Sequence, residues 1–288
     1  MSESNRLIEV LQTSAFPLGK PAACWKRADI TTPLACAPKE KTRLGFVLHY
    51  TDRMADSFCR LSILIPVFNE ERTVEEIIRR VRAADVGGLQ KEIIVVDDGS
   101  SDGTGEILKR LSASVGITVC SHPANRGKGA AVRTAIARAT GDILLIQDAD
   151  LEYDPSDYPR LLAPILDGRA DAVYGSRFLG GPHRVLLFWH FMANNLLTLL
   201  CNMLCNLNLT DMETGYKVFK RSCLDDIKLT ANRFGIEPEL TARLSRRRCR
   251  FYETPISYSG RDYSEGKKIN WTDGVAALWF IVRYRFFD

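Results

Sequence analysis

The acidic segment Gln147-Asp148-Ala149-Asp150-Leu151-Glu152 is the part of the chain most suited to do chemistry. It follows an apolar run, and if that run is a strand that continues, Asp148 and Asp150 point to the same side of the backbone. Two hard oxygen ligands so placed suit Mg²⁺ or Mn²⁺, which keep waters and borrow phosphate oxygens from a substrate. The sequence therefore predicts a divalent-metal site at Asp148 and Asp150. The alternative is that Asp150 caps a helix and Asp148 is solvated.

A second acidic pair, Asp97-Asp98, also follows an apolar run and precedes Gly99-Ser100. Two adjacent carboxylates repel each other unless something uses them. One could cap the turn, which leaves the other to accept hydrogen bonds from a base or a ribose. No Gly-x-Gly-x-x-Gly follows, so the segment is not a dinucleotide fingerprint.

Two basic segments could meet phosphates. Asn125-Arg126-Gly127-Lys128-Gly129 lacks the pattern of a Walker motif, and it is either a contact to a nucleotide through Lys128 or a plain strand-to-helix turn. Arg177, in Val173-Tyr-Gly-Ser-Arg-Phe178, could bind a diphosphate bidentately. Its alternative role is a surface ion pair.

The elements that must position these side chains alternate between strand and helix. Apolar, β-branched runs predict strands at 61–66, 92–97, 117–120 and 142–146. Helices are expected from Asn69 to Arg82, from Asp102 to Ser112, and after Gly129. Strands that are apolar on both faces predict a parallel sheet covered by helices. In such sheets ligands bind at the carboxyl ends of the strands. Four segments fall there: 66–70, where Asn69 could instead cap the next helix, 96–104, 147–152 and 173–178.

Composition narrows the class of protein. The net charge of +4 over 288 residues is too small to argue for nucleic acid, but it suits an anionic ligand or membrane surface. Eight cysteines without metal-ligand spacing, and no signal peptide at the start, favour a reducing cytoplasm. We expect residues 1–58 to be a poorly structured extension and residues 59–288 to form one domain.

Residues 185–210 contain no Asp, Glu, Lys or Arg, but several Asn residues make a membrane span unfavourable. Apolar residues recur at helical spacing and form one stripe: Trp189, Met192, Leu196, Leu199, Met203 and Leu207. The stripe belongs either to a core helix or to a helix lying at a membrane interface. The apolar tail 271–287 has the same two interpretations. Together with Lys267 and Lys268 it could rest on an anionic leaflet, or it could form a helix that packs on the core.

Five segments in this order resemble glycosyltransferase family 2: "ILIPVFNEE", "IIVVDDGSSDGT", "NRGKGAAVRTA", "DADLEYDP" and "YGSRF". The resemblance runs from about Leu61 to the C-terminus. Within the family the chain looks most similar to the polyprenyl-phosphate hexose synthases, whose segment before the acceptor-side helix is similar to "DMETGYKVFKR". The family implies inverting transfer and an α/β GT-A fold, a Rossmann-like, mostly parallel sheet sandwiched by helices with acceptor-side helices at the C-terminus.

The resemblance also implies roles for single residues. Those expected to cradle the nucleoside are Pro66, Phe68, Glu70 and Asp98, with Asp97 beside them. Asp148 and Asp150 would hold the sugar donor's diphosphate through Mg²⁺ or Mn²⁺, and Glu152 would add a metal ligand where the synthases often have Gln. Arg177 would face the phosphates, and Lys217 and Glu213 would lie on the acceptor side.

The acceptor decides the remaining chemistry. A polyprenyl phosphate is already anionic, so it needs cations rather than a base, and the candidate cations are Arg177, Lys217, Lys220 and Arg221. A sugar hydroxyl needs a carboxylate base, for which the candidates are Asp211, Glu213 and Glu237. We favour the lipid phosphate, a UDP-hexose donor over GDP-mannose, and an enzyme at the inner face of the membrane. A polysaccharide-synthesising transferase and a non-catalytic nucleotide-sugar-binding module are the alternatives.

Overall fold

A computed structural model describes residues 58–180, 188–233, 235–260 and 271–287, with backbone alone for 271–276. The chain divides after Arg53, and the unit Met54–Asp288 contains all of the described residues. The extension expected at 1–58 lies outside the described residues apart from Phe58, so it stays a prediction.

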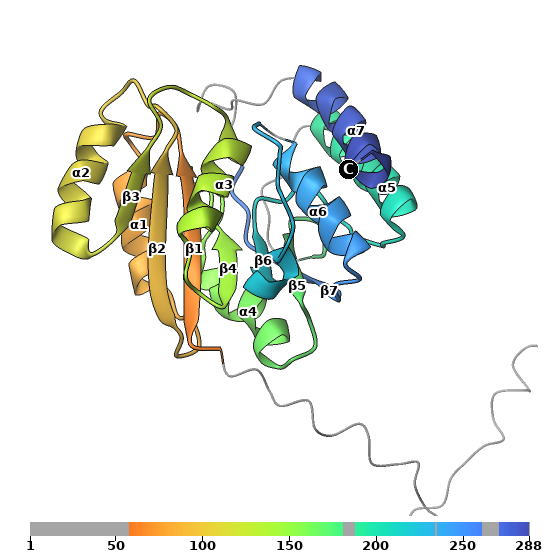
Figure 1. Cartoon of the computed structure of the whole chain (residues 1–288), viewed down its shortest axis with the longest axis horizontal. Coiled ribbons are helices and arrows are strands. Elements are labelled where there is room, and N and C mark those ends of the chain that lie inside the picture. Colours follow the sequence, from red (N-terminus) through yellow and green to blue (C-terminus); the bar gives the residue numbers. More distant parts are fainter. Residues whose placement is uncertain (1–57, 181–187, 234, 261–270, 288) are drawn as a thin grey trace, which may run out of the picture. The chain divides into compact units, whose positions relative to one another are not determined.

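Strands and helices alternate through most of the chain, as expected from the apolar runs (Figure 1). The elements are β1 (Arg60–Val67), α1 (Val74–Ala83), β2 (Gln90–Asp97), α2 (Thr104–Val115), β3 (Thr118–Ser121), α3 (Lys128–Arg138), β4 (Ile143–Ile146), η2 (Pro155–Asp157), α4 (Tyr158–Leu166), β5 (Ala172–Ser176), α5 (Phe188–Cys205), β6 (Lys217–Lys220), η3 (Arg221–Leu224), α6 (Ile236–Arg246), β7 (Phe251–Pro255) and α7 (Trp271–Phe286).

The strands form one seven-stranded sheet in the order β3-β2-β1-β4-β6-β5-β7. The β3, β2, β1 and β4 strands pair in parallel, and β5 pairs in parallel with β7. Only β6 runs against its neighbours, β4 and β5. The mostly parallel sheet is therefore confirmed, and the carboxyl ends of β1, β2, β4 and β5 share one edge.

Helices cover both faces of the sheet because successive strand residues point to opposite sides. In β2, Ile93 and Val95 pack into the cluster that contains the buried faces of α1, α2 and α4. Their neighbours Ile94 and Val96 pack into the cluster of α3, α5, α6 and α7. The core is thus two apolar layers on either side of one sheet.

The first strand does not end at Pro66 as the sequence suggested. Pro66 pairs in register with Val96, and β1 continues to Val67. The Leu64 carbonyl faces β4, since it accepts from the Gln147 amide, and Pro66 faces the same side. Pairing with β4 ends in register at Leu64, so the missing N–H of Pro66 costs no ladder bond.

The first helix begins later than predicted, at Val74 rather than at Asn69. Asn69 has φ 51°, and the Glu70 carbonyl accepts from the amides of Thr73 and Val74. Asn69 does not cap the helix either, because its Oδ1 accepts from the Ser101 amide at 2.8 Å. The segment is a turn that ties the end of β1 to the loop after β2.

Five residues of the predicted apolar stripe lie on α5 and are exposed, which excludes the core interpretation for that face. The sixth, Leu207, follows α5 and packs against the core instead. Leu197, Thr198, Cys201 and Cys205 form the buried face of α5. The tail helix α7 lies beside α5 and α6 and buries Ala277, Ile281 and Tyr284 (Figure 1). Within the described residues, no helix is long and apolar enough to cross a bilayer.

Candidate active site

The side chains singled out in the sequence meet at the carboxyl edge of the sheet. Asp97 is the last residue of β2, Asp148 is the second residue after β4, and Arg177 is the first residue after β5. This edge is where ligands bind in open α/β sheets. The aspartates after β4 are not on the strand, however, because β4 ends at Ile146 and Asp148–Asp150 lie in a turn. The strand alternation used to align them was therefore wrong.

Asp98 anchors the basic glycine loop. Its carboxylate lies 2.6 Å from Nδ1 of His122 and accepts from the backbone amides of Arg126 (3.0 Å) and Gly127 (2.7 Å). Gly127 has φ 95°, and a Cβ there would lie 2.3 Å from the Asn232 carbonyl oxygen, so only glycine fits. The loop leads directly into α3, and Lys128 is the first residue of that helix.

The other residues expected around a nucleoside lie beside this loop. Asp97 accepts from the Ser100 amide at 3.0 Å and so closes the turn after β2. Glu70 is buried, donates its amide to Thr104 Oγ1 (2.9 Å), and accepts from Thr73 Oγ1 at 2.7 Å. Pro66 is buried and Phe68 is half-buried at the end of β1. Their contact with a nucleoside stays a prediction.

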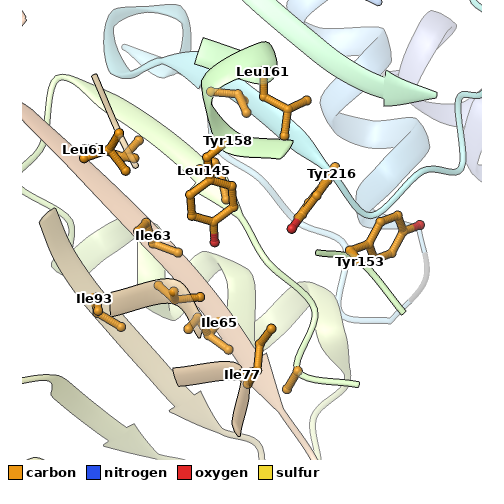
Figure 2. Packing of buried hydrophobic residues seen from close by; sticks show 14 of the residues in the cluster. Leu61, Ile63, Ile65, Ile77, Ile93, Leu145, Tyr153, Tyr158, Leu161 and Tyr216 are labelled. Atoms are coloured by element: carbon orange, nitrogen blue, oxygen red, sulfur yellow. The ribbon is translucent and has the colours of Figure 1, made fainter. Parts of the chain in front are cut away.

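Gln147 and two buried tyrosines hold the backbone of Asp148. Gln147 Oε1 accepts from the hydroxyls of Tyr158 (2.8 Å) and Tyr216 (2.7 Å), and its Nε2 donates to the Asp148 carbonyl. Tyr153, Tyr158 and Tyr216 are neighbours within the apolar core (Figure 2), and the Tyr153 and Tyr216 ring centroids are 4.8 Å apart. Burial of a fully satisfied network makes this support rigid.

The Asp148 carboxylate lies close to the backbone of the segment just before β6. A Cβ on Gly215 would lie 2.2 Å from Asp148 Oδ2, so glycine is required for the close contact. The Gly215 amide donates to the Tyr153 hydroxyl at 2.9 Å. The chain before β6 is therefore packed directly against the acidic turn.

Lys128 links that acidic turn to α6. Its ammonium lies 2.8 Å from Asp148 Oδ1, 3.0 Å from Asp148 Oδ2 and 3.0 Å from Glu237 Oε1. Burial disfavours the charged lysine, but the charges of Asp148 and Glu237 outweigh this and hold its pKa well above the ordinary value. The second oxygen of Glu237 is buried and has no hydrogen-bond partner among the described residues.

The acidic turn fits a divalent ion that keeps much of its own hydration. Asp148 already binds a cationic group with both oxygens and remains partly exposed. Asp150 Oδ1 accepts from the Glu152 amide at 3.1 Å, and Glu152 Oε2 accepts from the Tyr258 hydroxyl at 2.8 Å. In the described part of the chain, no three His, Cys, Asp or Glu side chains form a group that could hold a metal. An ion here would need waters or substrate phosphate to complete its shell.

Arg177 sits in a buried ion pair, not in the surface pair named as its alternative. Its Nε and Nη2 donate to the two oxygens of Asp211 at 2.6 and 2.7 Å, and Nη2 also donates to Asn194 Oδ1 at 3.1 Å. Burial opposes the charged guanidinium, but the Asp211 charge holds the Arg177 pKa well above its usual value. Nε and Nη2 of the planar fork thus bind the Asp211 carboxylate bidentately.

With this geometry in place, the chain can be compared with known proteins. The model of the family "Glycosyl transferase family 2" matches residues 62–228. The chain belongs to glycosyl transferase family 2. The family expected from the five sequence segments is thus confirmed.

Two curated relatives in the family act on polyprenyl phosphates, as their names state. The dolichol-phosphate mannosyltransferase of Pyrococcus furiosus is 36% identical over 122 residues, which is 42% of this chain and 34% of the relative. The undecaprenyl-phosphate 4-deoxy-4-formamido-L-arabinose transferase of Salmonella paratyphi A is 28% identical over 211 residues, 72% of this chain and 62% of the relative. The matched part of the chain spans less than two thirds of either relative's length.

Solved structures confirm the GT-A fold. Glucosyl-3-phosphoglycerate synthase from Mycobacterium tuberculosis, in complex with Mn²⁺, UDP and phosphoglyceric acid, superposes with a TM-score of 0.62 at 22% identity, covering 81% of this chain and 80% of that one. The same enzyme with Mg²⁺ and UDP gives a TM-score of 0.60 at 23% identity, covering 84% of each chain. At this identity the likeness extends to the fold alone.

The four cations proposed for the acceptor do not lie together in this family 2 chain. The β6 strand runs antiparallel to β4, with Lys217 opposite Ile146 and Lys220 opposite Ile143. Lys220 and Arg221 therefore lie at the amino end of β4, away from Asp148; Lys220 is 3.3 Å from Asp171, and Arg221 donates to the Ala139 carbonyl. The sequence named them for charge and could not reveal the strand direction.

Lys217 lies at the correct end but is buried. Its ammonium donates to the carbonyls of Met212 (2.7 Å) and Thr214 (2.5 Å) and lies 4.4 Å from the centroid of the Tyr174 ring. Burial lowers the Lys217 pKa to about 8, against the charges of Glu237 and Glu213. Burial and the nearby Glu237 raise the Glu213 pKa to about 8. Both residues belong to the acceptor side of the edge, and their contact with an acceptor stays a prediction.

Three residues of the site carried no sequence signal. His122 binds Asp98, Tyr153 binds the Gly215 amide, and Asn194 binds Arg177. Each acts on a residue that is far away in sequence, so local spacing does not show it. His122 directly follows β3 at the carboxyl edge, but the sequence alone did not single it out.

Proposed function

We propose that the chain transfers a hexose from a nucleoside-diphosphate sugar, with UDP-hexose favoured over GDP-mannose, to a polyprenyl phosphate with inversion at the anomeric carbon. The observation that carries this proposal is the meeting of Asp148, Lys128 and Glu237 at the carboxyl end of β4 in a family 2 chain. The names of two relatives support the acceptor class.

In this reaction the acceptor phosphate oxygen forms the new bond to the anomeric carbon, and the bond from that carbon to the nucleoside diphosphate breaks. A divalent ion bound by Asp148 and Asp150, with Glu152 as a further ligand, would neutralise charge on the departing diphosphate. Lys128 supplies a protein cation for the same charge, and Arg177 supplies one for the incoming acceptor phosphate. Fixed cations at a developing charge are worth several kcal/mol.

The state of the carboxylates favours an acceptor that needs no base. Both Asp211 oxygens accept from Arg177, and the raised pKa of Glu213, about 8, leaves that group mostly protonated at neutral pH. A phosphate acceptor has a second pKa of about 6 and is already a nucleophile at neutral pH. No proton then has to move during transfer.

One observation favours a second candidate function, transfer to a sugar hydroxyl in cell-surface polysaccharide synthesis. Glu237 Oε2 is buried without a hydrogen-bond partner in the described residues, as a base awaiting a hydroxyl would be. Its other oxygen, however, is already held by the Lys128 ammonium at 3.0 Å.

The test is to incubate the protein with a panel of UDP- and GDP-sugars, with Mn²⁺, Mg²⁺ or a chelator. One arm contains a short-chain polyprenyl phosphate and the other contains oligosaccharides. We expect a metal-dependent glycosyl phosphate, identified by mass, with the opposite anomeric configuration to the sugar donor. Product from oligosaccharide alone would establish the second candidate. Metal-dependent donor binding without transfer or hydrolysis would indicate a binding module.

The proposal places the protein in the cytoplasm, at or near the inner face of a membrane, because its acceptor is a lipid. Partners are the nucleotide sugar and the lipid phosphate, with no role for nucleic acid. The surface that would meet the membrane is a separate question.

A further inference from the structure

The outward face of α5 is the largest run of exposed apolar side chains in the described residues. Five residues at alternating steps of three and four lie on it: Trp189 (77% exposed), Met192 (44%), Leu196 (59%), Leu199 (56%) and Met203 (71%). At 100° per residue these positions form one narrow stripe on the side opposite the buried Leu197 and Cys201. Exposed apolar surface of this kind marks an interaction site.

The helix that bears the stripe has no charged residue from Phe188 to Cys205. A protein partner that docks on a surface usually meets charges at its rim, whereas a lipid interface requires an uncharged apolar face. Trp189 lies at one end of the stripe, and tryptophan is enriched at the level of lipid headgroups. The composition of the α5 face therefore matches a bilayer surface.

Cations gather at the other end of α5. The Cys205 carbonyl accepts from Ser245 Oγ at 2.8 Å, which brings the end of α6 to the end of α5. Arg247 and Arg248 follow there and are exposed, with Arg247 3.7 Å from Asp226. Arginines next to an apolar helix face complement anionic headgroups.

The buried side of the same helix reaches the candidate active site. Asn194 Oδ1 accepts from Arg177 at 3.1 Å, and the Phe191 and Phe178 rings pack edge to face at 5.3 Å between centroids. One helix thus has the site on one side and the uncharged stripe on the other. A lipid whose phosphate reaches Arg177 would need its chain near this helix.

We infer that the α5 stripe of Trp189, Met192, Leu196, Leu199 and Met203 docks the protein on the surface of a bilayer containing anionic lipid. The inference rests on the proposed function, because a polyprenyl-phosphate acceptor resides in a membrane. The α5 helix lies in the membrane interface and does not span the bilayer, because no helix of the described residues is long and apolar enough to cross it.

Vesicle sedimentation of the full chain tests the inference, with phosphatidylcholine vesicles with and without phosphatidylglycerol and no substrates. We expect binding to the anionic vesicles, and Leu199→Glu to lower the partition coefficient about tenfold or more. Tyr252→Glu is the matched control, since it makes the same kind of change at an exposed side chain of β7, and it should bind as the unmodified chain does. Brominated lipids should quench tryptophan fluorescence, and Trp189→Phe should remove most of that quenching.

Two outcomes would overturn the docking surface. One is that the protein binds neither kind of vesicle, or that Leu199→Glu and Tyr252→Glu bind the anionic vesicles equally well. The other is a dimer in light scattering that Leu199→Glu converts to a monomer, because the stripe would then bind a second copy. Failure of the proposed function looks different: normal vesicle binding and stripe dependence, but no transfer to any polyprenyl phosphate. Metal-dependent UDP binding without vesicles should be the same in Leu199→Glu and the unmodified chain, which checks that the variant is folded.

Discussion

The part of the carboxyl edge that we propose for the donor and the part that we propose for the acceptor are built in different ways. On the donor side, β1, β2 and β4 lie in parallel, and the Asp97 and Asp98 carboxylates bind mainly backbone amides of nearby loops. On the acceptor side, around the antiparallel strand β6, charged side chains pair with each other across elements, as in Arg177–Asp211. Lys128 is the bridge, since it joins Asp148 of β4's loop to Glu237 of α6.

The difference indicates what a substitution should disturb on each side. Removing a carboxylate that binds amides frees a loop, so the donor side should respond in geometry and stability. Removing one member of a buried ion pair leaves an uncompensated charge, so the acceptor side should respond in charge and pH dependence. The following predictions test this contrast.

The largest effect is expected from Asp150→Ala. Loss of a ligand for the ion that balances the leaving diphosphate should lower the transfer rate about a thousandfold or more, measured by product mass under saturating substrate. Asp150 is only partly buried, so the unfolding midpoint should change little. Asp167→Ala, an exposed carboxylate after α4 paired with Arg169, is the control and should keep full activity. A mutant with most of its activity would remove Asp150 from the mechanism.

Asp98→Ala should have the largest effect on stability. It leaves the His122 ring and the amides of Arg126 and Gly127 without their acceptor in a buried position. We expect a loss of about 3 kcal/mol in the free energy of unfolding, from urea denaturation, together with weaker UDP binding. Asp98→Asn keeps one acceptor oxygen and should lose less. If Asp98→Ala unfolds at the same urea concentration as the unmodified chain, backbone anchoring does not define the donor side.

The contrast also explains what the sequence could predict. The apolar runs gave four of the strands within a residue or two at most ends, and the strand-end motifs placed Asp97, Asp98 and Asp148 at one edge, because period and local order are sequence properties. The direction of β6 cannot be deduced from local sequence. The sequence therefore grouped Lys217, Lys220 and Arg221, although the structure places Lys217 at the opposite end of β6 from the other two.

The orientation of α5 is a similar case. The spacing of Trp189, Met192 and Leu196 predicted one apolar stripe, but periodicity cannot distinguish a core face from an exposed one. A second, less regular set containing Leu197 and Cys201 faces the core instead. Only the packing of α6 and α7 on that side decides which set is buried.

On the acceptor side, Glu213→Gln should change the pH dependence of stability. The Glu213 pKa is raised from its ordinary 4.5 to about 8 by burial and by Glu237, so between these values the folded state holds a proton that the unfolded state has released. Stability from this group is present below the lower value and is lost as pH rises towards the upper one. Relative to Glu213→Gln, the unmodified chain should lose about 3 to 4 kcal/mol between about pH 5 and about pH 8. Parallel curves for the two proteins, from urea denaturation, would contradict the raised pKa.

The smallest effect expected is that of Arg177→Lys, which keeps the charge and removes the fork. Lysine cannot donate to both Asp211 oxygens and Asn194 in the geometry that Arg177 uses. The transfer rate should fall about tenfold, while metal-dependent UDP affinity, measured by calorimetry, stays within about twofold. That split would place Arg177 with the acceptor side, whereas an equal loss in UDP affinity would move it to the donor side and erase the boundary drawn between the two. Asn194→Asp is a second variant, which keeps Arg177, removes the amide donor to Asp211 and adds a carboxylate beside the guanidinium. If the acceptor phosphate meets Arg177, the extra negative charge should raise the KM for the lipid and leave UDP binding as it was.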